Sequence, residues 1–394
     1  MLANEVNRRH FLLGAAVVAL DPALPAGTRD EAVLDALPGK QDLIKLSWRP
    51  PNYETPRDAF AEIATPNDRF FVRYHLAGLP SKEDLVGWSL TVGGDAAERE
   101  IRLSLDDLKA LPAAEIMAVC QCSGNRRGLM SPHVPGVQWG VGAMGNAVWR
   151  GVRLRDVLAK AGVRAGAVEV ALRGADGPVL DATPPFRKSI PLDRAMDETV
   201  LLAWEMNGEN LPIWNGYPLR LVVPGWTGTY WMKHLTRIDV LAKPLDGFWM
   251  QKAYRVPRGM FPTDRAFASQ DNDKTSPITD IPVNSLITAP LDGAAVPAGG
   301  FSVRGIAWDG GHGIGRLDIS TDGGGTWTAA TLGRESGRFA FRPWSFAVAG
   351  AMPGKLTVMA RATGADGATQ PAKPIANPAG YNHNAIASLT VVAT

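Results

Sequence analysis

The first two thirds of the chain combines the apolar patterns of strands with those of short helices. The run Ile116–Val119 is continuously apolar, which is typical of a buried strand, and Val168–Leu172 alternates as a half-buried strand does. Trp149–Leu158 leads into a helix whose apolar residues continue at helical spacing to Ala161, and Gly162 would end it. These patterns predict a mixed α+β domain.

The pattern changes after a polar stretch. Ser269–Pro277 is rich in polar residues, which is typical of a linker. Beyond it, short alternating segments recur with glycine-containing turns between them, and this spacing predicts an antiparallel β-sandwich. The clearest strands are Phe301–Trp308, Arg316–Ser320 and Leu356–Arg361. We therefore expect two domains, at 27–270 and 278–394.

The chain begins with the pattern of an export signal. Arg8 and Arg9 precede a short apolar run that continues to Leu20, which is typical of a twin-arginine (Tat) signal. The alternative is a short amphipathic helix, although the run is apolar on all sides. We expect residues 1–26 to be a Tat-type signal segment and the mature protein to be periplasmic.

Composition narrows the classes of partner. The 394 residues are 45% hydrophobic and 20% charged, with a formal net charge of +2. The basic residues are dispersed, so nothing indicates a nucleic acid partner. No apolar run beyond the N-terminal segment is long enough to span a bilayer. The haem attachment motif Cys-x-x-Cys-His does not occur, so we expect no haem on this chain.

Cys122 begins the segment that carries the most chemistry. It follows the apolar strand, and Arg126 and Arg127 come shortly after it. A thiolate is a soft metal ligand, and guanidinium groups beside it would lower its pKa and hold an oxyanion. A buried cysteine is, however, more often a small hydrophobic residue, and the arginines could form a solvated turn. A disulfide with Cys120 has poor geometry, and a zinc site lacks further ligands.

A family resemblance changes these odds. The run Cys-Ser-Gly-Asn-Arg-Arg at 122–127 resembles the signature of the sulfite oxidase and sulfite dehydrogenase family, in which the cysteine binds molybdenum. This implies that Cys122 is the metal ligand. Phe-Phe-Val-Arg-x-His at 70–75 resembles the segment that meets substrate and pterin, which implies that Arg73 binds the substrate anion and His75 the cofactor. Arg127 would bind the same oxyanion and stabilise charge during the reaction.

Further segments resemble the pterin site of the family. Gly-Tyr-Pro-Leu-Arg at 216–220 matches the segment whose arginine holds the pterin phosphate, a role that suits a planar guanidinium. The residues that the resemblance places at the cofactor are Arg220, Trp231, Met232, Lys233 and Asn215, which stands where the family can have a histidine. Phe248–Arg255 combines aromatic and basic residues, and we expect it near the mouth of the site.

Trp204 departs from the family pattern. Its segment, Val200–Gly208, is predicted to be a strand that runs into a turn, and in the resemblance it carries a tyrosine beside the metal where this chain has Trp204. An indole N–H donates a hydrogen bond but does not lose its proton near neutral pH. We expect Trp204 at the catalytic site or, as the alternative, in the core, and the departure leaves the substrate open.

Taken together, the resemblance implies an α+β fold: a sulfite-oxidase-type molybdopterin domain followed by an immunoglobulin-like dimerisation domain. The implied reaction is the oxidation of sulfite to sulfate by oxygen-atom transfer at molybdenum, with electrons passed singly to a separate c-type cytochrome. The chain would form a homodimer or a heterodimer with the cytochrome subunit. Two alternatives stay open: a molybdenum enzyme that acts on another sulfur compound, such as a sulfane or a sulfoxide, and an exported binding protein.

Overall fold

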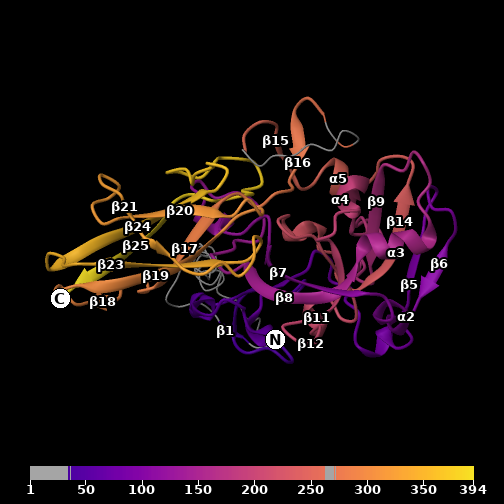
Figure 1. Cartoon of the computed structure of the whole chain (residues 1–394), viewed down its shortest axis with the longest axis horizontal. Helices are drawn as coiled ribbons and strands as arrows, with labels where there is room; N and C mark the ends of the chain where they lie inside the picture. Colours follow the sequence, from indigo (N-terminus) through magenta and orange to yellow (C-terminus); the bar gives the residue numbers. More distant parts are fainter. Residues whose placement is uncertain (1–33, 36, 262–269, 271) are drawn as a thin grey trace, which may run out of the picture.

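The computed structural model describes residues 34–35, 37–261, 270 and 272–394. The predicted export signal at 1–26 and, within the predicted linker, Ser269 and Asp271 lie outside these residues. The described chain forms two lobes that lie end to end along its long axis, with the second lobe beginning at β17 (Asn284–Ala289) (Figure 1). The cysteine segment lies where the two lobes meet.

In the described part of the chain, the first lobe is built on small sheets that are almost entirely antiparallel, with a single parallel pair of strands. The N-terminal arm pairs in the order β1 (Leu34–Asp35), β2 (Leu43–Ser47), β3 (Asn52–Glu54) and β4 (Val72–Arg73). A second sheet has the order β10 (Arg187–Pro191), β9 (Glu169–Gly174), β14 (Leu235–Leu241), β5 (Leu90–Gly93) and β6 (Ile101–Leu103). A third has the order β12 (Glu209–Asn210), β11 (Leu201–Met206), β8 (Met144–Arg153) and β7 (Ala113–Gln121), and β13 (Arg220–Val222) pairs with β11. A separate pair joins β15 (Arg255–Pro257) to β16 (Thr275–Pro277).

Short helices pack against these sheets. They are α2 (Leu105–Lys109), α3 (Leu154–Ala161), α4 (Leu192–Ala195) and α5 (Phe248–Gln251). The apolar face of α3 is buried, and the helix ends at Gly162, whose φ of 73° costs glycine least. The predicted helix and its end are therefore confirmed. Among the residues that the structure describes, no helix is long and apolar enough to cross a membrane.

The second lobe is a β-sandwich. One sheet has the order β17, β19 (Phe301–Trp308), β23 (Arg342–Val348) and β22 (Thr331–Leu332). The other has the order β18 (Ala295–Val296), β25 (Ala387–Ala393), β24 (Gly354–Gly364), β20 (Ile314–Ser320) and β21 (Thr328–Ala329). Alternate residues of these strands, such as Val303, Leu317 and Val358, point inward and form one core. The predicted α+β domain followed by a sandwich is confirmed.

The two lobes share a hydrophobic cluster. Val119 on β7 and Met144 on β8 pack in it with Leu286, Ile306 and Trp308 of the sandwich. The indole of Trp308 also lies edge-on to Phe341, with ring centroids 5.4 Å apart. The cysteine strand is therefore covered on one side by the second lobe.

Candidate active site

The cysteine strand has two different faces. Side chains alternate across a strand, so Cys120 and Cys122 share one face of the segment, and Val119 and Gln121 share the other. Both cysteines are buried free thiols. The turn after Cys122 is fixed by Ala143, whose carbonyl oxygen accepts from the Cys122 amide at 2.9 Å and whose amide donates to Asn125 Oδ1 at 3.1 Å.

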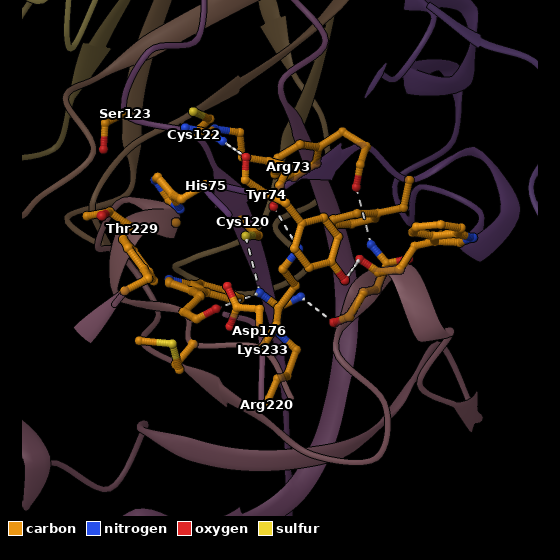
Figure 2. Close-up of a pocket in the computed structure, with 18 of the residues that line it drawn as sticks. Arg73, Tyr74, His75, Cys120, Cys122, Ser123, Asp176, Arg220, Thr229 and Lys233 are labelled. Atoms are coloured by element: carbon orange, nitrogen blue, oxygen red, sulfur yellow. Dashed lines mark hydrogen bonds between the residues drawn. The ribbon is translucent and has the colours of Figure 1, made fainter. Parts of the chain in front are cut away.

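A cavity opens beside the two thiols (Figure 2). It encloses roughly 680 Å³ of space, including its open mouth. Its walls come from segments that are far apart in the sequence, among them β4, the end of β7, β13 and the turn η7 (Gly228–Tyr230). Its polar lining consists of Arg73, Tyr74, His75, Cys120, Cys122, Ser123, Asp176, Asn215, Arg220, Thr229, Lys233 and Tyr254.

Arg220 lies fixed at the back of this cavity. Its guanidinium donates to the Asn215 carbonyl oxygen at 3.0 Å and points Nη2 at Cys120 Sγ, 3.8 Å away, as the dashed line in Figure 2 shows. The same group lies over the rings of Trp149 and Trp231, at 4.7 and 5.5 Å from their centroids. Burial lowers the pKa of Arg220, yet a guanidinium stays charged at neutral pH. The cavity thus contains a rigid, planar cation.

Lys233 and Asp176 add two more ionisable side chains to the cavity. Lys233 Nζ donates to the Arg73 carbonyl oxygen at 2.7 Å, and burial holds the pKa of Lys233 well below its usual value while Asp176 opposes that shift. Burial likewise raises the pKa of Asp176. With Arg73 and Arg220, three basic side chains face one carboxyl group among the described lining residues. This balance favours an anionic ligand, which would also return the Lys233 ammonium to its charged form.

Tyr254 and His75 form a hydrogen-bonded pair in the cavity wall. The Tyr254 hydroxyl bonds His75 Nε2, and the His75 ring stacks on Phe186 with centroids 4.0 Å apart. Burial, with Arg73 and other nearby cations, holds the pKa of His75 well below its usual value, so the ring is neutral at pH 7. Burial also raises the pKa of Tyr254, so its hydroxyl keeps its proton.

The structure brings most of the predicted site residues together. Those that line the cavity are Arg73, His75, Cys122, Asn215, Arg220, Trp231, Met232 and Lys233. The Asn215 amide is already engaged, because its Oδ1 accepts from Lys40 Nζ at 2.6 Å and its Nδ2 donates to the Phe71 carbonyl oxygen at 3.2 Å. Its side chain therefore ties the N-terminal arm to the site.

Arg127 does not reach the cavity lining. Its Nε donates to the Ala379 carbonyl oxygen at 2.7 Å, its Nη1 donates to the Val137 carbonyl oxygen at 3.0 Å, and its guanidinium lies over the Tyr381 ring. The Arg127 guanidinium lies directly against the backbone of Gly124 and Gly136. A Cβ atom at these glycines would come within 2.5 and 2.8 Å of the guanidinium. In this arrangement Arg127 fastens the cysteine turn to the second lobe, and its predicted role at the oxyanion stays a prediction.

Trp204 also lies away from the cavity lining, contrary to the catalytic placement that we expected. It is buried in the main core, and its indole N–H donates to Glu205 Oε1 at 3.2 Å. The physical reason is a bulge: the register of β11 against β8 shifts between Ala203 and Glu205, so Trp204 lies where the regular alternation is interrupted.

Sequence reasoning missed six polar residues of the lining: Tyr74, Cys120, Ser123, Asp176, Thr229 and Tyr254. Tyr254 falls within the aromatic and basic segment that we expected at the mouth, so a signal for it was present. Asp176 follows β9 in a loop, where nothing in the local pattern separates it from other loop aspartates. Only the pairing of β9 with β14 brings it to Lys233.

Comparisons with known proteins agree with this geometry. A family model described as "Oxidoreductase molybdopterin binding domain" matches residues 76–249, and one described as "Mo-co oxidoreductase dimerisation domain" matches residues 275–392. Mitochondrial sulfite oxidase of Macaca fascicularis is 38% identical over 361 residues, which cover 86% of this chain and 64% of the relative. The human enzyme is 39% identical over 78% of this chain and 57% of its own length.

Two further relatives match over most of their length. Sulfite oxidase of Arabidopsis thaliana is 37% identical over 79% of this chain and 81% of its own length. The crystal structure of the sulfane dehydrogenase SoxCD from Paracoccus pantotrophus superposes with a TM-score of 0.74 at 25% identity, covering 99% of this chain and 93% of that one. The chain spans less than two thirds of the mitochondrial relatives but most of these two.

Proposed function

Because this chain belongs to the sulfite oxidase family of molybdopterin-binding oxidoreductases, we propose that it oxidises sulfite to sulfate with a molybdenum cofactor. The observation that carries the proposal is the cavity in which the Cys122 thiol and the basic side chains of Arg73, Arg220 and Lys233 converge. A soft ligand and an anion-binding surface in one cavity are what a metal cofactor with a phosphate group requires.

The residues present fit such a cofactor. Ser123 Oγ, Thr229 Oγ1 and Arg220 Nε are buried without a hydrogen-bond partner in the described structure, and all three residues line the cavity. Buried polar groups are normally paired, so three orphans around one cavity indicate a ligand with several polar atoms. Among the described residues, no group of three or more His, Cys, Asp and Glu side chains is placed so that it could hold a metal ion. A metal that arrives on its own organic ligand needs only one thiolate from the protein.

The roles of the chain's own residues follow from their positions. Cys122 would ligate the metal, Arg220 and Lys233 would hold the anionic end of the pterin, and Asp176 could accept hydrogen bonds from its amino groups. When bound, molybdenum would supply the two-electron chemistry that converts sulfite and water into sulfate and two protons. Arg73 would bind the sulfite oxyanion by charge-assisted hydrogen bonds.

The neutral pair of Tyr254 and His75 suits proton handling. The reaction releases protons in a cavity whose other basic side chains, Arg73, Arg220 and Lys233, would bind anions. A neutral imidazole that is bonded to a phenol can accept a proton at one nitrogen while the hydroxyl keeps its orientation. The low pKa of His75 means that it would pass this proton on readily.

We propose three further properties that accompany this activity. Electrons would leave singly to a separate c-type cytochrome, because the sequence carries no Cys-x-x-Cys-His motif. The second domain would pair two chains in a homodimer, a proposal supported by the match to a dimerisation-domain model. The twin arginines Arg8 and Arg9 support Tat export to the periplasm.

A direct test combines metal analysis with a steady-state assay. Purified protein should contain molybdenum in stoichiometric amount and should reduce ferricyanide or cytochrome c when sulfite is added. Cys122→Ser, purified in parallel, should lose this activity. Protein that carries a full complement of molybdenum but gives no sulfite-dependent reduction would overturn the proposal, and protein that binds no molybdenum when the cofactor is available would support a non-catalytic binding protein instead.

A second candidate is the oxidation of another sulfur compound. It is favoured by the likeness to a sulfane dehydrogenase over 99% of this chain. Comparing kcat/KM for sulfite with that for sulfane-sulfur donors on the same preparation separates the two. A higher value for the sulfane donors would favour the second candidate.

A further inference from the structure

The residues on either side of Cys122 are bound by the second lobe. Gln121 precedes Cys122 and faces away from the cavity, and its Oε1 accepts from the indole N–H of Trp308 at 2.7 Å. Ser123 follows Cys122, and its carbonyl oxygen accepts a hydrogen bond from the backbone N–H of Asn382 at 3.0 Å. Neither Trp308 nor Asn382 lines the cavity.

Other bonds extend this attachment along the same strand. The Val119 amide donates to the Phe339 carbonyl oxygen at 2.9 Å, which adds a segment of the sandwich beside β7. Further along, Arg126 donates to the carbonyl oxygens of Ser285 and Ala385. One face of the cysteine segment therefore forms the cavity wall while the opposite face is held by the sandwich.

The bond between Trp308 and Gln121 is the side-chain contact nearest to Cys122 in this set. Both residues are almost fully buried, at 1% and 2% exposure, so water cannot readily replace either partner. A buried acceptor that loses its donor is costly, and the strand would shift to satisfy it. Because successive side chains point to opposite faces, a rotation of the backbone at Gln121 turns the Cys122 thiol away from the cavity.

We propose that Trp308 is a positioning residue: through Gln121 it holds the end of β7 so that the Cys122 thiol points into the cavity. The sandwich thus acts on the site in addition to any role in pairing chains. The proposal rests on the proposed function only for its activity readout, because the orientation of the thiol can be measured without the cofactor.

The following variants distinguish the loss of this hydrogen bond from a general loss of stability. Trp308→Phe keeps an aromatic ring and removes the N–H donor, and Gln121→Met removes the acceptor at similar length. Trp344→Phe is the matched control, because Trp344 is a buried tryptophan of the same lobe whose indole N–H has no partner in the described structure. The double variant of Trp308 and Gln121 tests whether the two residues act as a unit.

The first readout uses full-length protein made in a host that cannot synthesise molybdopterin. The rate at which iodoacetamide alkylates Cys122 is followed by mass spectrometry, with fragment ions that distinguish Cys122 from Cys120. Iodoacetamide reaches the thiol through the cavity, so turning the thiol away predicts that Trp308→Phe and Gln121→Met each lower this rate about fivefold. The double variant should be no less reactive than the less reactive single variant. Trp344→Phe should react as the wild type does.

The second readout uses the holoenzyme. Arg73 lies on β4 and has no contact with Trp308, so Trp308→Phe should lower kcat for sulfite about tenfold and change KM less than twofold. An unchanged or raised alkylation rate in Trp308→Phe would overturn the inference, as would equal reactivity of Trp308→Phe and Trp344→Phe. If Trp308→Phe yields no soluble protein, Gln121→Met decides in the same way. If the wild type does not oxidise sulfite, the proposed function fails while the alkylation comparison still decides this inference.

Discussion

A buried carboxyl group on the N-terminal arm makes a quantitative prediction about pH and stability. Glu54, at the end of β3, has no exposed surface, and its Oε2 accepts from the Gly140 amide at 2.7 Å. Its Oε1 has no partner among the described residues. Burial raises the pKa of Glu54 from 4.5 to about 8, so the side chain is mostly protonated in the folded protein at neutral pH. Glu54→Gln replaces it with a neutral group of the same shape.

The sign of the effect follows from proton binding. The folded state keeps the Glu54 proton up to about pH 8, whereas the unfolded chain releases it above about pH 4.5. Stability from this group is therefore complete below about pH 4.5 and is lost as the pH rises through about 8. Between pH 6 and 8.5 the loss amounts to about 3 kcal/mol at ~1.4 kcal/mol per pH unit. With an unfolding entropy of roughly 2 cal/mol/K per residue, that loss corresponds to about 4 °C in Tm.

Thermal unfolding of the two proteins at pH 6 and 8.5 tests this. All other titrating groups are shared by the two proteins and contribute equally to both. The Tm of Glu54→Gln relative to that of the wild type should therefore increase by about 4 °C from pH 6 to 8.5. Glu62→Gln, at an exposed glutamate close to the arm, should show no such change. A Tm difference for Glu54→Gln that is the same at both pH values would refute the reasoning, because it would mean that the buried carboxyl is ionised throughout.

Three further predictions concern the cavity. Cys122→Ser should abolish sulfite-dependent turnover while Tm falls by less than about 4 °C, because a hydroxyl fills most of the thiol's space but is a poor soft-metal ligand. Arg220→Lys should lower the molybdenum content of purified protein several-fold by elemental analysis, because an ammonium cannot reproduce the fixed planar contacts of the guanidinium. Tyr254→Phe should lower kcat for sulfite about tenfold with unchanged molybdenum content, because it removes the hydroxyl that bonds His75; a normal kcat would exclude the hydroxyl from the reaction.

Local patterns predicted the parts of the fold that local forces determine. The apolar spacing before Gly162 correctly predicted α3 and its end, and the alternation in Phe301–Trp308 predicted β19 with the same bounds. The cysteine motif was located because a thiol followed by paired arginines is chemically unusual. What those arginines contact was not predictable, because Arg127 and Arg126 end on carbonyl groups of the second lobe, some 160 to 260 residues away.

The expected position of Trp204 in the catalytic site differs from the observed one for a similar reason. In a regular strand, successive side chains point to opposite faces, and this rule sets the expected direction of the side chain at position 204. The bulge in β11 interrupts this alternation at Trp204. A bulge depends on how two strands pair, and the pairing of β11 with β8 joins segments some fifty residues apart. The sequence of Val200–Gly208 by itself carries no mark of it.

The position of Trp204 bears on the choice between sulfite and another sulfur compound as the substrate. Trp204 favoured another sulfur compound only if its indole replaced a phenol beside the metal. The indole instead bonds Glu205, and a phenol does line the cavity, because Tyr254 presents its hydroxyl there and bonds His75. A phenol can both donate and accept a hydrogen bond near neutral pH, whereas an indole can only donate. The cavity therefore contains a phenol after all, and the presence of a tryptophan at position 204 is no longer an argument against sulfite as the substrate. The sulfane alternative now depends on the likeness of the whole chain to a sulfane dehydrogenase, and a kcat/KM for sulfane-sulfur donors above that for sulfite is the result that would favour it.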